Sequence, residues 1–275
     1  MQVDLFLILS VFAFALGACI ASFLNVVIWR VPRGESIVSP PSHCPKCNAA
    51  IRWYQNIPIL SWLALRGRCA NCREPISPRY LLVELTGGLL FFAVFAHYFE
   101  PYWWSWVFIP KNWIWVSLML AGSMIDFDHK LLPDFTTVGG MVLGLATAAG
   151  LSIAYGWNFR PLLVSAGGLV FGFGLLWLVR FFGSKAFKRE AMGMGDVFLM
   201  GAVGAVHGPS AVLFTLIFSS VFGSVFGVLG ITLSKSRFAR FTEIPYGPYI
   251  CMADLLYMFC GQSIITAYLK TLGAA

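Results

Sequence analysis

Residues 192–196 read Met-Gly-Met-Gly-Asp and stand directly before an apolar run that continues to Val206. An ionisable residue such as Asp196 is costly inside a membrane segment, and such residues are typical of functional sites. Gly193 and Gly195 have no Cβ and therefore allow another backbone to approach closely. The alternative interpretation is that Asp196 is the N-cap of the following helix, where a negative charge is favourable. A second acid at the same depth would favour the functional interpretation.

Asp126 is the candidate partner, because it lies at the end of an earlier apolar run. Two neighbouring carboxylates do not ionise together readily, so they share a proton; one then acts as a base toward water while the other polarises a carbonyl. This is the chemistry of an aspartic protease. The sequence contains no H-E-x-x-H metalloprotease motif and no G-x-S-x-G serine hydrolase motif. Proton-coupled transport is a rival interpretation, although transport sites lie near the membrane midplane and are often built from repeated halves.

The composition indicates that these acids belong to a membrane protein. The chain is 59% hydrophobic and 11% charged, with a mean hydropathy of +0.78, whereas a soluble domain has about 25% charged residues. Its apolar runs predict an all-α polytopic membrane protein with about eight transmembrane helices in a lipid bilayer. The runs cover residues 5–29, 81–99, 110–127, 135–155, 161–182, 192–207, 211–233 and 249–269. The first run is too long for a signal peptide and has no basic segment before it, so we expect it to be retained.

The distribution of Lys and Arg predicts the orientation. With eight spans and an external N-terminus, all but three of the 19 basic residues lie on one side, the exceptions being Lys111, Arg160 and Lys270. By the positive-inside rule that side is cytoplasmic, and both termini are extracytoplasmic. The net charge of +7 thus reflects topology and does not indicate a nucleic-acid partner. Asp126 and Asp196 both reach the cytoplasmic face. Both runs are short: Pro110 to Ile125 is 16 residues, or about 24 Å, and the run that begins near Asp196 is similar, so we expect the acids to lie below the membrane surface.

The only long polar stretch, residues 30–80, contains two Cys-x-x-C pairs separated by 21 residues. Each pair turns two thiolates toward one point, and two pairs complete the tetrahedral site of a zinc-ribbon-like module. Disulfides are the competing interpretation, but the cytoplasm is reducing. Four sulfurs leave no open position, so we expect structural Zn²⁺. The predicted ligands are Cys44, Cys47, Cys69 and Cys72.

Other acids also lie in or near apolar runs, among them Glu84, Asp128, Asp134, Glu243 and Asp254. We expect Glu84 to reach toward the membrane surface or to pair with an arginine, and Asp128 to be solvated. Asp134 is expected to be the N-cap of the fourth helix. Glu243 precedes a rigid Pro-containing loop, and Asp254 is either structural or near the two candidate catalytic acids.

Together the motifs resemble the bacterial type 4 prepilin peptidases, also called prepilin leader peptidase/N-methyltransferases. That family belongs to the GxGD aspartyl intramembrane proteases, which include presenilin. The resemblance covers nearly the whole chain, with one departure: Tyr246 stands where Phe is usual in a Pro-x-Gly-Pro motif. The motifs are residues 21–30, the two cysteine pairs, 56–63, 65–69, 77–80, 83–84, Asp126 with 133–134, 193–196 and 245–248.

The resemblance implies a multi-pass inner-membrane enzyme that removes the basic leader of type IV prepilins and of type II secretion pseudopilins. Cleavage follows a glycine at the cytoplasmic face, and S-adenosylmethionine then supplies a methyl group to the new N-terminal residue. Asp126 and Asp196 match the catalytic pair, Gly193 and Gly195 match the backbone that supports it, and the four cysteines match the metal-binding residues. No G-x-G-x-x-G nucleotide motif accompanies the implied methyltransferase activity.

We therefore expect a first transmembrane helix at 1–29, a cytoplasmic tetracysteine module at 30–80 and a seven-helix peptidase core at 81–275. A membrane transporter or an assembly scaffold with a zinc ribbon and buried acids is the alternative function.

Overall fold

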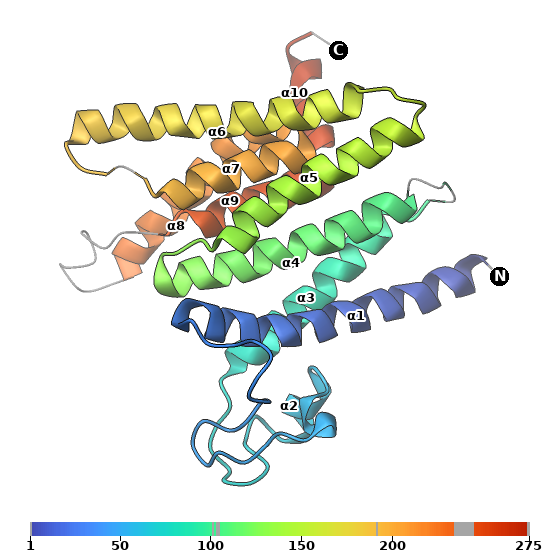
Figure 1. The fold of residues 1–275 in the computed structure, drawn as a ribbon, viewed down its shortest axis with the longest axis vertical. Helices are drawn as coiled ribbons and strands as arrows, with labels where there is room; N and C mark the ends of the chain where they lie inside the picture. The colour runs from blue at the N-terminus through green and yellow to red at the C-terminus, as the bar shows by residue number, and fades with distance from the viewer. Residues whose placement is uncertain (1, 101, 103–104, 191, 234–244, 274–275) are drawn as a thin grey trace. The chain divides into compact units, whose positions relative to one another are not determined.

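The computed structural model describes the whole chain except residues 1, 101, 103–104, 191, 234–244 and 274–275. Within the described residues the fold is helical, and extended pairing is limited to two isolated β-bridges in the cysteine-containing segment. Figure 1 shows long helices and one largely irregular segment that includes the short helix α2 (Leu60–Ala64). The predicted all-α class is confirmed.

The predicted apolar runs correspond to helices in the same order. The helices are α1 (Gln2–Arg30), α3 (Pro78–Tyr98), α4 (Ser105–His129), α5 (Asp134–Ala154), α6 (Arg160–Phe187), α7 (Met194–His207), α8 (Pro209–Leu233) and α9 (Gly247–Leu256), and α9 continues through a π-helical turn (Tyr257–Gly261) into α10 (Gln262–Thr271). Short 3₁₀ turns at Val31–Arg33 and Trp53–Asn56 lie in the polar segment.

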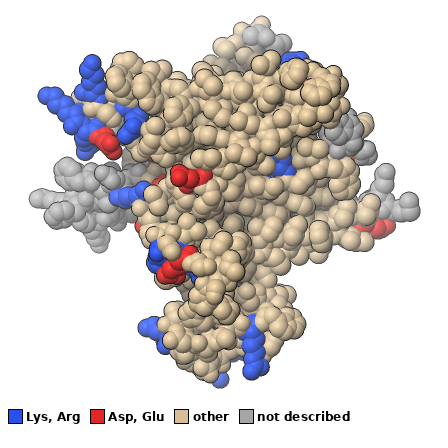
Figure 2. Space-filling model, viewed as in Figure 1, with Lys and Arg blue, Asp and Glu red and all other residues tan. Residues whose placement is uncertain are grey.

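Six of these segments are long and apolar enough to cross a membrane: α1, α3, α5, α6, α8 and the continuous α9–α10 segment. The chain is therefore a multi-pass membrane protein. On the face shown in Figure 2, Lys, Arg, Asp and Glu are sparse over the helices, as expected for surfaces that meet lipid.

The two helices that carry the candidate acids differ in length. Helix α7 has 14 residues, about 21 Å, as expected for a short helix. Helix α4 has 25 residues, about 37 Å, so the expectation of a short third helix is wrong. The apolar run began at Pro110, but the helix includes that proline and starts at Ser105; it also continues past Asp126 to His129.

The chain divides into two compact units, Met1–Ala121 and Gly122–Ala275. In the first unit α1 packs on α3 through small residues, since a Cβ added at Gly87 would overlap Ala21 and one added at Gly17 would lie 2.6 Å from the Phe91 Cβ. The ring of Trp113 stacks on that of Phe91, with centroids 5.1 Å apart, and its Nε1–H donates to the Phe91 carbonyl at 2.9 Å.

In the second unit α7 is the central helix, because it packs against α5, α6, α8 and α9. Its residues Val197 and 199–206 are all buried, which explains why it is apolar on every face. Glycines permit the close approach: a Cβ added to Gly168 on α6 or to Gly204 on α7 would overlap the backbone of the other. The backbone of α7 is thus fixed against α6, and with it the position of Asp196.

Candidate functional site

Asp126 lies in the last turn of α4, and its side chain is only 6% exposed. The backbone N–H of Gly247, the first residue of α9, donates a hydrogen bond of 3.0 Å to Oδ2 of Asp126. A Cβ added at Gly247 would lie 2.7 Å from the same oxygen. The loop that precedes α9 therefore approaches Asp126 as closely as only glycine allows.

Asp196 is the third residue of α7, and its side chain is 8% exposed. The N-cap is Gly193, so the interpretation of Asp196 as the N-cap is wrong. Its carboxylate instead interacts with the backbone N–H of Gly193, as the N3 side chain does in a capping box, and a Cβ at Gly193 would lie 3.5 Å from Oδ2 of Asp196. The carboxylate is held against the start of its own helix, where the helix dipole favours a negative charge.

The two carboxylates lie close enough to interact electrostatically. Leu132, from the connection between α4 and α5, packs beside Gly195 and Gly247: its Cβ would lie 2.9 Å from a Cβ at Gly195, and its Cδ1 3.3 Å from one at Gly247. The end of α4, the start of α7 and the start of α9 thus converge on one buried acid pair. Two acids that share a proton can act as general base and general acid.

Asp254 is not part of this convergence. It is fully buried and forms a pair with His207, whose Nδ1 lies 2.9 Å from Oδ1 of Asp254. His207 ends α7, so this pair lies at the opposite end of that helix from Asp196. Next to it, the hydroxyls of Ser210 and Tyr257 are 2.7 Å apart. Of the two roles expected for Asp254, the structure favours the structural one.

Glu84 does not reach outward as expected. It is buried, and its Oε2 accepts the backbone N–H of Ile59 at 2.8 Å. Ile59 has φ 64° and ψ −55°, and the N–H of Leu60 donates to the carbonyl of Pro58. This is a classic γ-turn, which is rare and strained. Glu84 therefore anchors a strained turn in the polar segment.

The remaining acids are peripheral. Asp128 is exposed. Asp134 is the first residue of α5, and Pro133 is its N-cap, so the expected N-cap role of Asp134 is wrong by one residue. Glu243 lies outside the described residues.

Tyr246 differs from the usual Phe by a hydroxyl, and that hydroxyl has a partner. It lies 2.6 Å from Oγ of Ser219, a fully buried residue on α8. The departure from the motif is thus accommodated by a hydrogen bond that ties the loop before α9 to α8.

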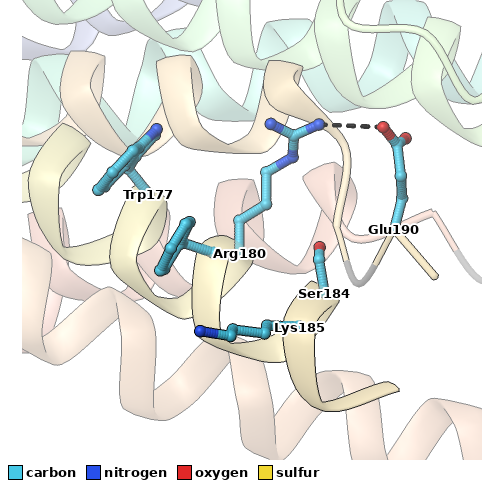
Figure 3. Close-up of a pocket in the computed structure, with 6 residues that line it drawn as sticks. Trp177, Arg180, Ser184, Lys185 and Glu190 are labelled. Carbon is cyan, nitrogen blue, oxygen red and sulfur yellow. Dashed lines mark hydrogen bonds and ion pairs between the residues drawn. The ribbon is translucent and has the colours of Figure 1, made fainter. Parts of the chain in front are cut away.

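Arg180 on α6 is a residue that the sequence interpretation missed, because it counted only as a cytoplasmic charge. Its guanidinium contacts the segment before α7 and borders a cavity of about 470 Å³ (Figure 3). No motif or spacing indicated this contact. The cavity is lined by Trp177, Arg180, Phe181, Ser184, Lys185 and Glu190.

The four cysteines of the polar segment form one cluster, as predicted, with all four sulfurs within 4.8 Å of one another. The two Cys-x-x-C pairs have the same backbone hydrogen bond. The N–H of Cys44 donates to the Ala49 carbonyl at 3.0 Å, and the N–H of Cys69 donates to the Glu74 carbonyl at 2.8 Å. None of the seven cysteines is in a disulfide. The cluster has the donor set and the compactness to hold a metal ion.

The surroundings of the sulfurs also suit a metal. The backbone N–H of Ala49 and the side chain of Asn71 lower the pKa of Cys47 to about 6, which favours the thiolate that a metal needs. At Cys72 the backbone N–H of Glu74 lowers the pKa, but burial and the neighbouring thiols outweigh it and raise that pKa to about 12. A bound cation would remove this repulsion among the sulfurs and displace the proton.

Comparison with known proteins gives a consistent result. The family model of the bacterial peptidase A24 N-terminal domain matches residues 15–98, and that of the type IV leader peptidase family matches residues 113–228. No solved structure matches the chain.

Several curated relatives carry the name prepilin leader peptidase/N-methyltransferase. A relative from Stutzerimonas stutzeri is 36% identical over 94% of this chain and 93% of its own length. One from Pseudomonas aeruginosa is 34% identical over 94% of this chain and 92% of its own length. One from Myxococcus xanthus is 46% identical over 71% of this chain, and the match spans 55% of that relative. The chain belongs to the type IV leader peptidase family.

Proposed function

We propose that this protein is a membrane aspartic endopeptidase in which Asp126 and Asp196 are the catalytic pair. The observation that carries the proposal is the convergence of these two buried carboxylates from α4 and α7, each held by a backbone N–H. Gly193 and Gly195 are the proposed supporting backbone: a Cβ at Gly195 would lie 2.9 Å from the Cβ of Leu132, and one at Gly193 would lie 3.5 Å from Oδ2 of Asp196. The family of the chain and the names of its relatives agree with this function.

The proposed reaction uses one proton shared by the pair. The ionised carboxylate removes a proton from water, whose oxygen attacks the carbonyl carbon of the scissile peptide. The protonated carboxyl donates its proton to the carbonyl oxygen. As the tetrahedral intermediate collapses, the leaving amine takes the proton that the first carboxylate removed from water, and a hydroxyl of the intermediate returns a proton to the second carboxylate. The pair is then in its starting state. Because backbone N–H groups fix both carboxylates, they are held ready for this exchange.

We propose type IV prepilins and pseudopilins as substrates, cleaved after a glycine that follows a basic leader. The bacterial inner membrane is the proposed location, with the acid pair and the cysteine cluster facing the cytoplasm and both termini on the other side. The distribution of basic residues supports this orientation. The substrate helix would enter from the bilayer while its basic leader remains in the cytoplasm.

The proposed organisation is a first transmembrane helix at 1–29, a metal-binding module at 30–80 and a peptidase core at 81–275. Zn²⁺ is the proposed metal. Sulfurs about 2.3 Å from a tetrahedral zinc lie about 3.8 Å from each other, and the sulfurs of Cys44 and Cys72 are 3.8 Å apart. The four thiols would hold the ion without an open position, so it would stabilise the polar segment.

N-methylation of the new N-terminus, with S-adenosylmethionine as methyl donor, is the second proposed activity. It is supported by the name that these relatives share, prepilin leader peptidase/N-methyltransferase. Transport or scaffolding is not favoured, since the family is one of peptidases.

The test is cleavage of a purified prepilin by the wild-type protein and by Asp126→Asn, Asp196→Asn and Asp128→Asn variants. Asparagine keeps the shape of the side chain and removes its ionisation. We expect Asp126→Asn and Asp196→Asn to lose cleavage. Asp128 is an exposed residue of α4, the helix that carries Asp126, so Asp128→Asn should retain cleavage. Cleavage by both Asp126→Asn and Asp196→Asn would overturn the proposal. The intact mass of the product shows whether a methyl group is added.

A further inference from the structure

The side chain of Arg180 makes three contacts with the segment that leads into α7. Its Nε–H donates to the carbonyl of Met192 at 3.0 Å, and its two terminal nitrogens lie 3.4 Å from Sδ of Met194 and 3.2 Å from Oε1 of Glu190. Figure 3 shows the guanidinium directed toward Glu190, with the ion pair drawn as a dashed line. One side chain of α6 thus contacts three residues that precede or begin the helix of Asp196.

The contact between Arg180 and Met192 is linked to Asp196 through one peptide unit, which joins Met192 to Gly193. The carbonyl of Met192 and the N–H of Gly193 belong to the same planar peptide unit, and in a trans peptide they point in opposite directions. Arg180 binds the carbonyl, and the N–H interacts with the carboxylate of Asp196, whose Oδ2 would lie 3.5 Å from a Cβ at Gly193. Rotation of this plane would move both groups together, so fixing one fixes the other. Hydrogen bonds in such a chain also polarise and strengthen each other.

We propose that Arg180 is a positioning residue for the peptidase reaction: it orients the Met192–Gly193 peptide so that the Gly193 N–H holds the carboxylate of Asp196. This inference rests on the proposed role of Asp196 as a catalytic residue. Arg180 itself acts only through the peptide.

The chemistry of the side chain supports this role. Arg180 is 27% exposed and is fixed at three of its nitrogens, whereas Glu190 is 81% exposed. An exposed ion pair contributes little stability, so the contact with Glu190 adds little to the contact with the Met192 carbonyl. The planar guanidinium fixes direction better than the point charge of a lysine does. Loss of Arg180 would therefore free the peptide plane, while loss of Glu190 would leave the Met192 contact intact.

The test measures kcat and KM for cleavage of a purified prepilin, together with the melting temperature Tm of each variant. Arg180→Gln should lower kcat by about tenfold to a hundredfold, with KM within about twofold, because a misplaced reacting group slows chemistry without weakening substrate binding. Arg180→Lys should recover part of the lost kcat, since an ammonium group can donate to the Met192 carbonyl. The matched controls Glu190→Gln and Lys185→Gln should keep kcat within about twofold of the wild type.

An unchanged kcat in Arg180→Gln, or a change confined to KM, would overturn the inference. An equal loss of kcat in the Gln and Lys variants, accompanied by an equal fall in Tm, would also overturn it in favour of a general folding role. If Arg180→Gln does not fold, Arg180→Lys decides: a lower kcat at wild-type Tm supports positioning, and an unchanged kcat excludes it. Asp126→Asn and Asp196→Asn are assayed in parallel. Cleavage by these two variants would refute the catalytic role of the acid pair, and this result is distinct from any result that refutes only the role of Arg180.

Discussion

Asp126 and Gly247 are 121 residues apart in the sequence, and the Gly247 N–H donates to Oδ2 of Asp126 at 3.0 Å. A methyl group at Gly247 would lie 2.7 Å from that oxygen and 3.3 Å from Cδ1 of Leu132. We expect Gly247→Ala to displace the carboxylate and to lower kcat for prepilin cleavage by up to about a hundredfold. The measurement is steady-state cleavage by the purified variant.

Gly174→Ala is the control for that substitution. Gly174 is a helical glycine of α6, and a Cβ added there meets nothing within 4 Å. Alanine is the better helix former, so this variant should keep kcat and should not lose stability. Equal activity of the two variants would show that the contact between Asp126 and Gly247 does not matter for catalysis.

The contact between α6 and α7 should depend on Gly168 and Gly204. Because a Cβ at either glycine overlaps the backbone of the other helix, we expect Gly204→Ala to force the helices apart and to cost about 1–3 kcal/mol of stability. A fall in Tm in detergent would measure it. Gly167→Ala is the matched control, since Gly167 is the neighbour of Gly168 and faces open space; a comparable loss in this variant would refute the prediction.

The cysteine cluster should determine the zinc content. We expect the purified protein to contain about one zinc per chain and the Cys44→Ser, Cys69→Ser double variant to contain almost none, because a serine removes the thiolate ligand. Elemental analysis measures the content. Cys260→Ser changes an exposed thiol outside the cluster and should keep the metal. Full zinc in the double variant would disprove the assignment of the metal site.

Glu84 should stabilise the strained turn at Ile59. Glu84→Ala leaves the N–H of Ile59 without its carboxylate acceptor, whereas Glu84→Gln retains an amide oxygen that can accept the bond. We expect proteolysis of residues 56–64 to accelerate in the alanine variant and much less in the glutamine variant. Equal protection of both variants would show that the turn does not need Glu84.

Asp254 should be required for stability. In Asp254→Leu the Nδ1 of His207 loses the partner that now lies 2.9 Å away, at a cost of about 1–3 kcal/mol. Asp254→Asn keeps an oxygen at that position and should lose less. Both variants should cleave prepilin with the wild-type kcat while folded, because Asp254 lies at the other end of α7 from Asp196. A large loss of kcat in folded Asp254→Asn would contradict this separation.

The helical class, the order of the apolar segments and the grouping of the four cysteines were all predictable from the amino-acid sequence. These features depend on local composition and on short spacings: a helix that meets lipid must be apolar along its length, and a Cys-x-x-C turn places two sulfurs together wherever it occurs. The family resemblance was likewise carried by short motifs, such as Gly-Met-Gly-Asp at 193–196.

Which distant groups meet depends on how the helices pack, and this was visible only in the folded chain. An apolar run shows how many consecutive residues are hydrophobic, but it does not show where the helix begins and ends. The sequence therefore did not predict the full length of α4. Spacing along the chain does not report which carbonyl a long side chain reaches, which is why Arg180 was counted only as a charge and Glu84 was assigned the wrong partner. Arg180, Glu84 and Asp126 each bind a backbone group, namely the carbonyl of Met192 and the N–H groups of Ile59 and Gly247. Every residue carries such groups, so the side-chain sequence does not reveal which of them will be used.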